Sequence, residues 1–142
     1  MSEADIQRIF ETEPVPDHIL EKMEELRKKG KELPDLSLLK RPSHIQGIIE
    51  AGKINTGVLD EVASKIHAGM TTQEIDDIVA EYTRSHNAIC APLHFEGYPK
   101  SVCTSVNEEV CHGIPDENVV LKDGDIINVD VSTILDGYFS DS

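Results

Sequence analysis

The stretch IINVDVSTILDGYFSD, residues 126–141, has the pattern of a β-hairpin with one apolar and one polar face. Alternate apolar residues of its first arm share one face: Ile127, Val129 and Val131. The intervening polar residues share the other: Asn128, Asp130 and Ser132. Asp136-Gly137 is typical of a two-residue hairpin loop, because both residue types accept the positive φ that such a loop requires.

The hairpin loop fixes which residues of the two arms face each other. A two-residue loop places Leu135 opposite Tyr138 and Ser132 opposite Asp141, so Asp130 lies diagonal to Asp141 on the polar face. Diagonal neighbours are about 7–8 Å apart, a separation that two carboxylates and a metal ion can span. Two facing carboxylates repel each other unless a proton or a cation neutralises them, which favours a divalent ion. The alternative is that both aspartates decorate the solvent side of the hairpin.

The first part of the chain predicts a helical extension. A helix is expected from Asp17 to the Gly30 stop signal, with apolar residues at helical spacing on one face. The segment Leu33–Pro42 contains two prolines and predicts a connector. We therefore place a domain boundary near Arg41, with residues 1–42 as a helical extension and linker and residues 43–142 as the main domain.

Two helices and then strands are predicted in the main domain. Apolar residues recur at helical spacing from Ser43 until Gly69. Thr71 and Glu74 form a capping box that begins a second helix. After Asn87 short apolar runs are broken by glycine and proline, so strands and loops follow, and functional residues are expected there.

Composition narrows the classes of partner. The chain has 142 residues and a net charge of -14, which disfavours direct binding to nucleic acid or to anionic membranes. Three cysteines without CxxC spacing are expected to be reduced thiols. No secretory leader or membrane-spanning stretch is apparent, so a cytoplasmic location is expected.

One histidine and several pocket residues stand out in the second half of the chain. His112 lies in a turn-prone segment, where an imidazole can titrate near neutrality or hydrogen-bond a substrate. Phe95, Tyr98 and Cys103 flank glycine and proline breaks and can line a small apolar pocket, although ordinary core packing explains them equally well. The sequence has no GxGxxG, Walker, HExxH or GxSxG motif.

Two long motifs resemble those of type I methionine aminopeptidases. The first is YPKSVCTSVNEEVCHGIP, residues 98–115, and the second is KDGDIINVDV, residues 122–131, followed by Asp136-Gly137-Tyr138 and Asp141. The resemblance covers residues 43–142. It implies an α+β pita-bread fold, of which this chain would hold only the first αβ half together with the amino-terminal helical extension.

The resemblance also implies roles for individual residues. Asp130 and Asp141 would bridge two divalent metal ions (cobalt, manganese, iron or zinc), and His112 would hydrogen-bond the substrate near the scissile amide. Phe95, Tyr98 and Cys103 would help form the methionine pocket. In the family a further histidine and two glutamates complete the metal site beyond the position of Ser142, so we expect the isolated chain to have little or no activity.

The implied function is removal of the amino-terminal methionine from nascent proteins by a metal-activated water. Its substrates would be nascent polypeptide amino termini, and the resemblance suggests the ribosome as a partner of the full-length enzyme. Two other readings stay open: a relative that cleaves proline-containing peptides, and a non-catalytic pita-bread module that binds peptides.

Overall fold

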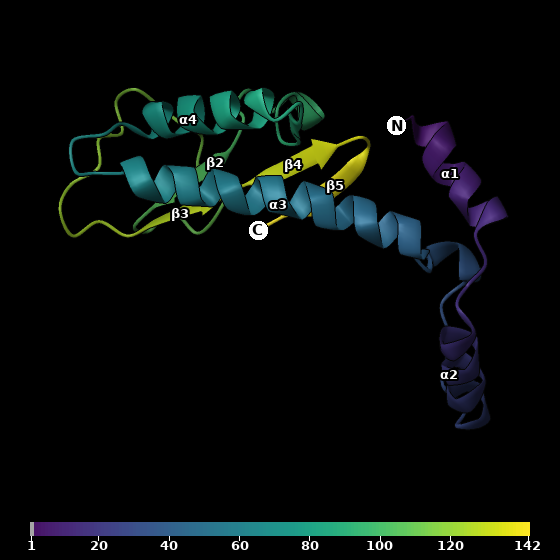
Figure 1. The fold of residues 1–142 in the computed structure, drawn as a ribbon. Helices are drawn as coiled ribbons and strands as arrows, with labels where there is room; N and C mark the ends of the chain where they lie inside the picture. The colour runs from purple at the N-terminus through teal and green to yellow at the C-terminus, as the bar shows by residue number, and fades with distance from the viewer. Residues whose placement is uncertain (1) are drawn as a thin grey trace. The chain divides into compact units, whose positions relative to one another are not determined.

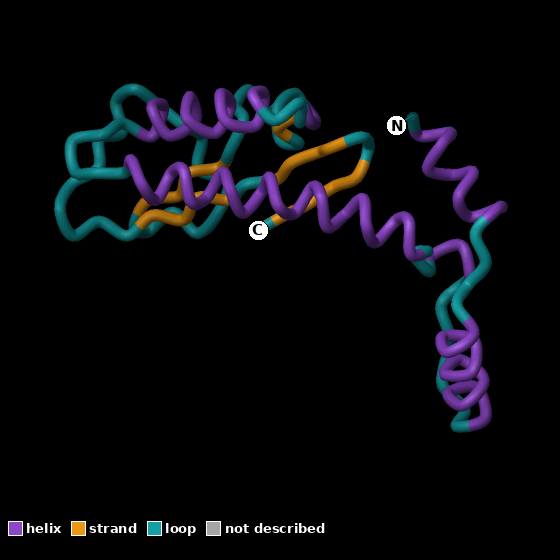
Figure 2. Tube along the Cα trace, in the orientation of Figure 1, coloured by secondary structure: helices purple, strands orange, loops and turns teal. Residues whose placement is uncertain are grey.

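The computed structural model describes residues 2–142, which divide into two compact units, Met1–Gly47 and Ile48–Ser142. Helices fill the first part of the chain and give way to strands and loops (Figures 1 and 2). The longer helices are α1 Glu3–Thr12, α2 Asp17–Lys28, α3 Pro42–Lys65 and α4 Thr72–Ser85. The shorter elements are η1 Leu36–Leu38, β1 Ile89–Cys90, η2 Phe95–Gly97, β2 Cys103–Val106, β3 Ile127–Asp130, β4 Ser132–Leu135 and β5 Tyr138–Asp141.

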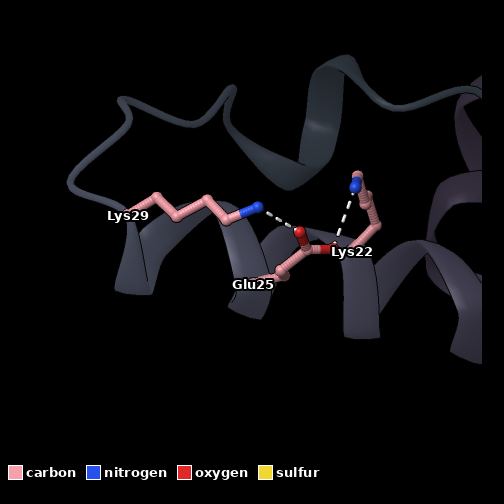
Figure 3. A network of polar contacts seen from close by, with 3 residues as sticks. All are labelled: Lys22, Glu25 and Lys29. Atoms are coloured by element: carbon pink, nitrogen blue, oxygen red, sulfur yellow. Dashed lines mark hydrogen bonds and ion pairs between the residues drawn. The ribbon is translucent and has the colours of Figure 1, made fainter.

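The helix expected after Asp17 is present as α2. Pro16 precedes it without a side-chain cap, and Asp17 lies in the first turn, where a negative charge favours the helix amino terminus. Glu25 forms ion pairs with Lys22 and Lys29 along the exposed face (Figure 3). Exposed pairs of this kind contribute little to stability, because water and salt screen them. Helix α1, which begins with a capping box between Ser2 and Asp5, was not predicted from the sequence.

Arg41 organises the unit Met1–Gly47. Its buried guanidinium donates hydrogen bonds to three backbone carbonyls, those of Glu13 (2.9 Å), Leu39 (2.6 Å) and Leu36 (3.3 Å). The segment that was expected to be a simple connector contains the short helix η1. The Arg41 hydrogen bonds fix this segment to Glu13, which lies before α2. Helix α3 begins at Pro42, one residue before the expected start, which suits proline because the first helical N–H has no intrahelical acceptor.

Two helices belong to the unit Ile48–Ser142: the part of α3 that follows Gly47, and the whole of α4. Both expected helices are present, and the capping box of Thr71 and Glu74 begins α4. The two helices lie side by side (Figure 1), so closely at Gly57 that an added Cβ would lie 2.3 Å from the Tyr82 hydroxyl oxygen. The core joins these helices to the strands: Val58, Val62, Met70, Ile75, Val79, Cys90, Val102, Leu121 and Val131. No helix within residues 2–142 combines the length and the apolar character needed to cross a bilayer.

The strands form two antiparallel sheets, one with the order β1-β4-β5 and one with β2 and β3. The expected hairpin register is confirmed, with Leu135 opposite Tyr138 and Ser132 opposite Asp141. The first arm is not one continuous strand, because β3 pairs with β2 and β4 pairs with β5. Val131 lies between β3 and β4 and bonds to the backbone of Ser142 through both its N–H and its carbonyl (3.3 and 3.1 Å).

Candidate metal and substrate site

A cavity of about 810 Å³ lies in the unit Ile48–Ser142 and brings together all of the site residues proposed from sequence. These residues are Phe95, Tyr98, Cys103, His112, Asp130 and Asp141. They come from η2 and the residue that follows it, from β2, β3 and β5, and from the loop that follows β2. Residues far apart in the sequence therefore share one concave surface, as ligand sites commonly do.

The two aspartates lie at strand ends on the cavity wall. Asp130 ends β3, is half-buried and pairs with Cys103 of β2, whereas Asp141 ends β5 and is exposed. The Ser132 hydroxyl donates a hydrogen bond to the Asp141 carboxylate. Because Val131 pairs with Ser142, Asp130 is one step further along the ladder and remains diagonal to Asp141.

No basic side chain within the described part of the chain forms an ion pair with these carboxylates. The same part of the chain holds no group of three or more histidine, cysteine, aspartate or glutamate side chains placed to bind a metal ion. The cavity wall therefore offers the carboxylates of Asp130 and Asp141. Carboxylate oxygens are ligands that hard divalent cations prefer.

Tyr98 is fixed as a neutral hydrogen-bond donor. Its hydroxyl donates to the carbonyl of Val102 (3.0 Å) and lies 3.3 Å from that of Gly113. Burial raises the pKa of the Tyr98 phenol well above its usual value, and the neighbouring Cys103 adds to the shift. The phenol therefore stays protonated through the neutral range and links two segments of the cavity wall.

The loop that carries His112 is held against the edge of β2. Gly113 accepts a hydrogen bond from the Thr104 amide (2.8 Å) and donates one to the Ser105 hydroxyl (3.1 Å). A Cβ at Gly113 would lie 2.0 Å from the Thr104 carbonyl oxygen, so only glycine fits. His112 itself adopts a positive φ of 57° and is exposed. The close approach of Gly113 presents the imidazole at the cavity.

Some residues that line the cavity were not predicted from the sequence. Phe139 lines the cavity from β5, although 63% of its surface is exposed, and Ile114 and Ser132 also line it. Phe139 precedes Asp141 by two residues, so the alternation of the strand could have placed both on one face. Phe95 is also largely exposed, which does not fit the alternative that it is an ordinary core residue.

Comparison with known proteins extends this picture. Residues 46–142 match metallopeptidase family M24. The chain is 47% identical to methionine aminopeptidase A from Synechocystis sp. over 106 residues, which cover 75% of this chain and 42% of the relative. It is 46% identical to mitochondrial methionine aminopeptidase 1D from Danio rerio over 129 residues, which cover 91% of this chain and 38% of the relative. The chain thus spans about two fifths of the length of these relatives.

Solved structures with a similar fold include methionine aminopeptidases. Methionine aminopeptidase from Rickettsia prowazekii superposes with a TM-score of 0.71 at 42% sequence identity, over 72% of this chain and 41% of that protein. The expected α+β pita-bread fold, present in part, is therefore confirmed.

Proposed function

Because this chain belongs to metallopeptidase family M24, we propose that it forms the amino-terminal half of a metal-dependent methionine aminopeptidase, which removes the first methionine from nascent proteins. The observation that carries the proposal is the cavity in which Asp130, Asp141 and His112 meet an apolar wall. The sequence identity to methionine aminopeptidases supports the same substrate class.

Asp130 and Asp141 are the proposed metal ligands. Their carboxylates lie diagonal to each other on one wall without a basic partner within residues 2–142, which is the arrangement that a divalent cation stabilises. Bound divalent ions, which we take to be two ions of cobalt, manganese, iron or zinc, would activate a water and polarise the scissile carbonyl. The Ser132 hydroxyl orients the Asp141 carboxylate for this role.

Three residues form the proposed methionine pocket. Phe95 and Tyr98 supply aromatic surface, and Cys103 contributes a soft thiol opposite Asp130. A thioether packs well against aromatic rings, so such a wall suits a methionine side chain. His112, exposed at the cavity, is placed to hydrogen-bond the substrate near the scissile amide.

The wider biology follows from the same proposal. The substrates are the amino termini of nascent polypeptides, the location is the cytoplasm, and the ribosome is the partner of the full-length enzyme. We expect the 142-residue chain alone to release little methionine, because residues 2–142 supply only two of the carboxylates that a dinuclear site needs.

The test is the peptidase activity of a chimeric protein. The chain is joined to the carboxy-terminal portion of the Synechocystis relative, beginning after the residue aligned with Ser142, and assayed on Met-Ala-Ser and on an Ala-Pro-Ser peptide. We expect chelator-sensitive release of methionine that Asp141→Asn reduces by at least about 100-fold. Asp123→Asn, an exposed aspartate outside the cavity, serves as the control. Cleavage of the proline peptide alone would favour a prolidase-like enzyme, and equal activity of both variants would refute the metal role.

A further inference from the structure

Asp76 is a buried carboxylate that the proposed chemistry does not use. It lies on α4, exposes 7% of its surface and does not line the cavity. Burial raises the pKa of this carboxyl above its usual value, so keeping an aspartate here has an energetic cost. A buried acid without a catalytic task calls for another explanation.

The partner of Asp76 is the backbone next to the cavity wall. Its Oδ1 accepts a hydrogen bond of 2.7 Å from the amide of Ser101, 25 residues further along the chain. Gln73 lies on the same helix, donates to the other Asp76 oxygen (3.4 Å) and accepts a hydrogen bond from Lys100. Two neighbouring residues, Lys100 and Ser101, are therefore tied to α4.

Ser101 lies between two residues of the proposed pocket. Tyr98 is three residues before it and Cys103 is two residues after it, and both line the cavity. The Tyr98 hydroxyl donates to the carbonyl of Val102, which directly follows Ser101. The amide of Ser101 is thus the backbone group through which the Tyr98–Cys103 segment is attached to α4, beside the side-chain contact of Lys100.

We propose that Asp76 is a positioning residue: its carboxylate holds the Ser101 amide and thereby keeps Tyr98 and Cys103 in the cavity wall, with Cys103 opposite Asp130. That this wall receives a methionine side chain rests on the proposed function. The attachment of the wall to α4 does not, and it can be tested without metal or peptide.

The three cysteines provide the readout. Cys103 reports on the wall, Cys90 lies in the core and reports on global opening, and Cys111 is exposed and reports on the reagent. Alkylation of each thiol is followed by peptide-resolved mass spectrometry in the 142-residue protein. The variants are Asp76→Ala, which removes the acceptor, Asp76→Asn, which keeps an acceptor oxygen, and Asp77→Ala, which removes an exposed carboxylate of the same helix.

The positioning role predicts a selective change. Asp76→Ala should raise the labelling rate of Cys103 by about tenfold or more relative to Cys90, because a buried hydrogen bond to a charged group is lost. Asp76→Asn and Asp77→Ala should stay within about threefold of the unchanged protein, since the Ser101 amide keeps its acceptor in both. An equal rise at Cys90 and Cys103 would mean that Asp76 only stabilises the whole unit. That result, an unchanged Cys103 rate in Asp76→Ala, or failure of Asp76→Asn to restore protection would each overturn the proposal.

Discussion

Gly113 holds the His112 loop against β2, and the space beside it excludes any side chain. The Thr104 carbonyl oxygen would lie 2.0 Å from a Cβ at this position. Such a contact forces backbone to move, because the obstacle is itself backbone and not the end of a flexible side chain. The position of His112 at the cavity therefore depends on its neighbour having no side chain.

Gly113→Ala should destabilise the protein by about 1–3 kcal/mol, the usual cost of overpacking. Urea unfolding followed by circular dichroism measures the loss. Gly52→Ala is the matched control, because its Cβ would meet only the Ser140 hydroxyl oxygen at 3.7 Å within a helix. Alanine there should leave stability unchanged or raise it by about 0.5–1 kcal/mol. Equal effects of the two substitutions would contradict the close approach at Gly113.

Asp76 gives the stability of the protein a pH dependence of defined sign. Its folded-state pKa is raised above the usual 3.8, so between these two values the folded protein binds more protons than the unfolded chain. Stability contributed by the protonated acid is therefore lost as the pH rises from about 3.8 through the folded pKa. The free energy of unfolding relative to Asp76→Asn should fall over this window and then level off. Chemical denaturation of both proteins from pH 3 to 7 measures it, and a difference that moves in favour of aspartate would contradict the buried environment.

For individual residues, the sequence predicted the position of side chains that alternate along a strand. It did not predict the role of residues that act through long-range contacts. Asp130 and Asp141 could be placed on one face because the Asp136-Gly137 loop fixes the parity of the hairpin. Asp76 could not be identified, since its role depends on the Ser101 amide 25 residues away. Helical spacing with Ile75 and Val79 places Asp76 on the buried face of α4, but it does not name the amide that the carboxylate binds.

Among the elements, the arm that begins at Ile127 shows what alternation leaves open. The residues alternate without interruption, yet β3 ends at Asp130 and pairs with β2, whereas β4 begins at Ser132 and pairs with β5. Periodicity records which face a side chain takes but not which strand is the partner. The prediction was therefore right about the facing residues and wrong about a single continuous strand. The exchange of partners brings Cys103 opposite Asp130 and so joins the proposed pocket to the proposed metal ligands.

The segment around Arg41 departs from a simple linker for a similar reason. Arg41 was only a boundary marker in the sequence, because the carbonyls that it binds belong to residues before and after α2. Arginine spreads its donors over a rigid planar fork that reaches carbonyls in different directions, whereas the three donors of lysine all radiate from one nitrogen. Arg41 thus joins residues before and after α2 through contacts that local patterns do not reveal.

Arg41→Lys should loosen the unit Met1–Gly47. Loss of the fork deprives these partly buried carbonyls of well-aligned donors, at a cost of about 0.5–1.5 kcal/mol for each hydrogen bond lost. Amide hydrogen exchange should lose protection in α1 and α2 by at least about tenfold while α4 stays unchanged. Arg27→Lys is the control, because Arg27 is exposed and its ion pair with Glu24 contributes little. Unchanged protection in α1 would show that Arg41 does not hold this unit together.

For the whole molecule, the sequence predicts a domain boundary near Arg41, and the structure divides into two compact units between Gly47 and Ile48, within α3. A boundary inside a continuous helix leaves no change of composition in the sequence. The predicted boundary therefore rested on the two prolines of residues 33–42. The candidate site lies entirely in the unit Ile48–Ser142, which also contains most of the residues that match family M24. In this unit we propose that Asp130 and Asp141 together bind divalent metal ions, more tightly than the acidic side chains elsewhere on its surface do.

The most direct test is calorimetric titration of the 142-residue protein with Mn²⁺ and Co²⁺, compared with Asp130→Asn, Asp141→Asn and the exposed control Asp123→Asn. We predict saturable binding that weakens by at least about tenfold in each cavity variant and is retained in the control, because a hard cation loses one of two carboxylate ligands. Equal affinity in all four proteins would assign the heat to the general acidic surface. That outcome, or the absence of saturable binding to the unchanged chain, would contradict a metal site at Asp130 and Asp141.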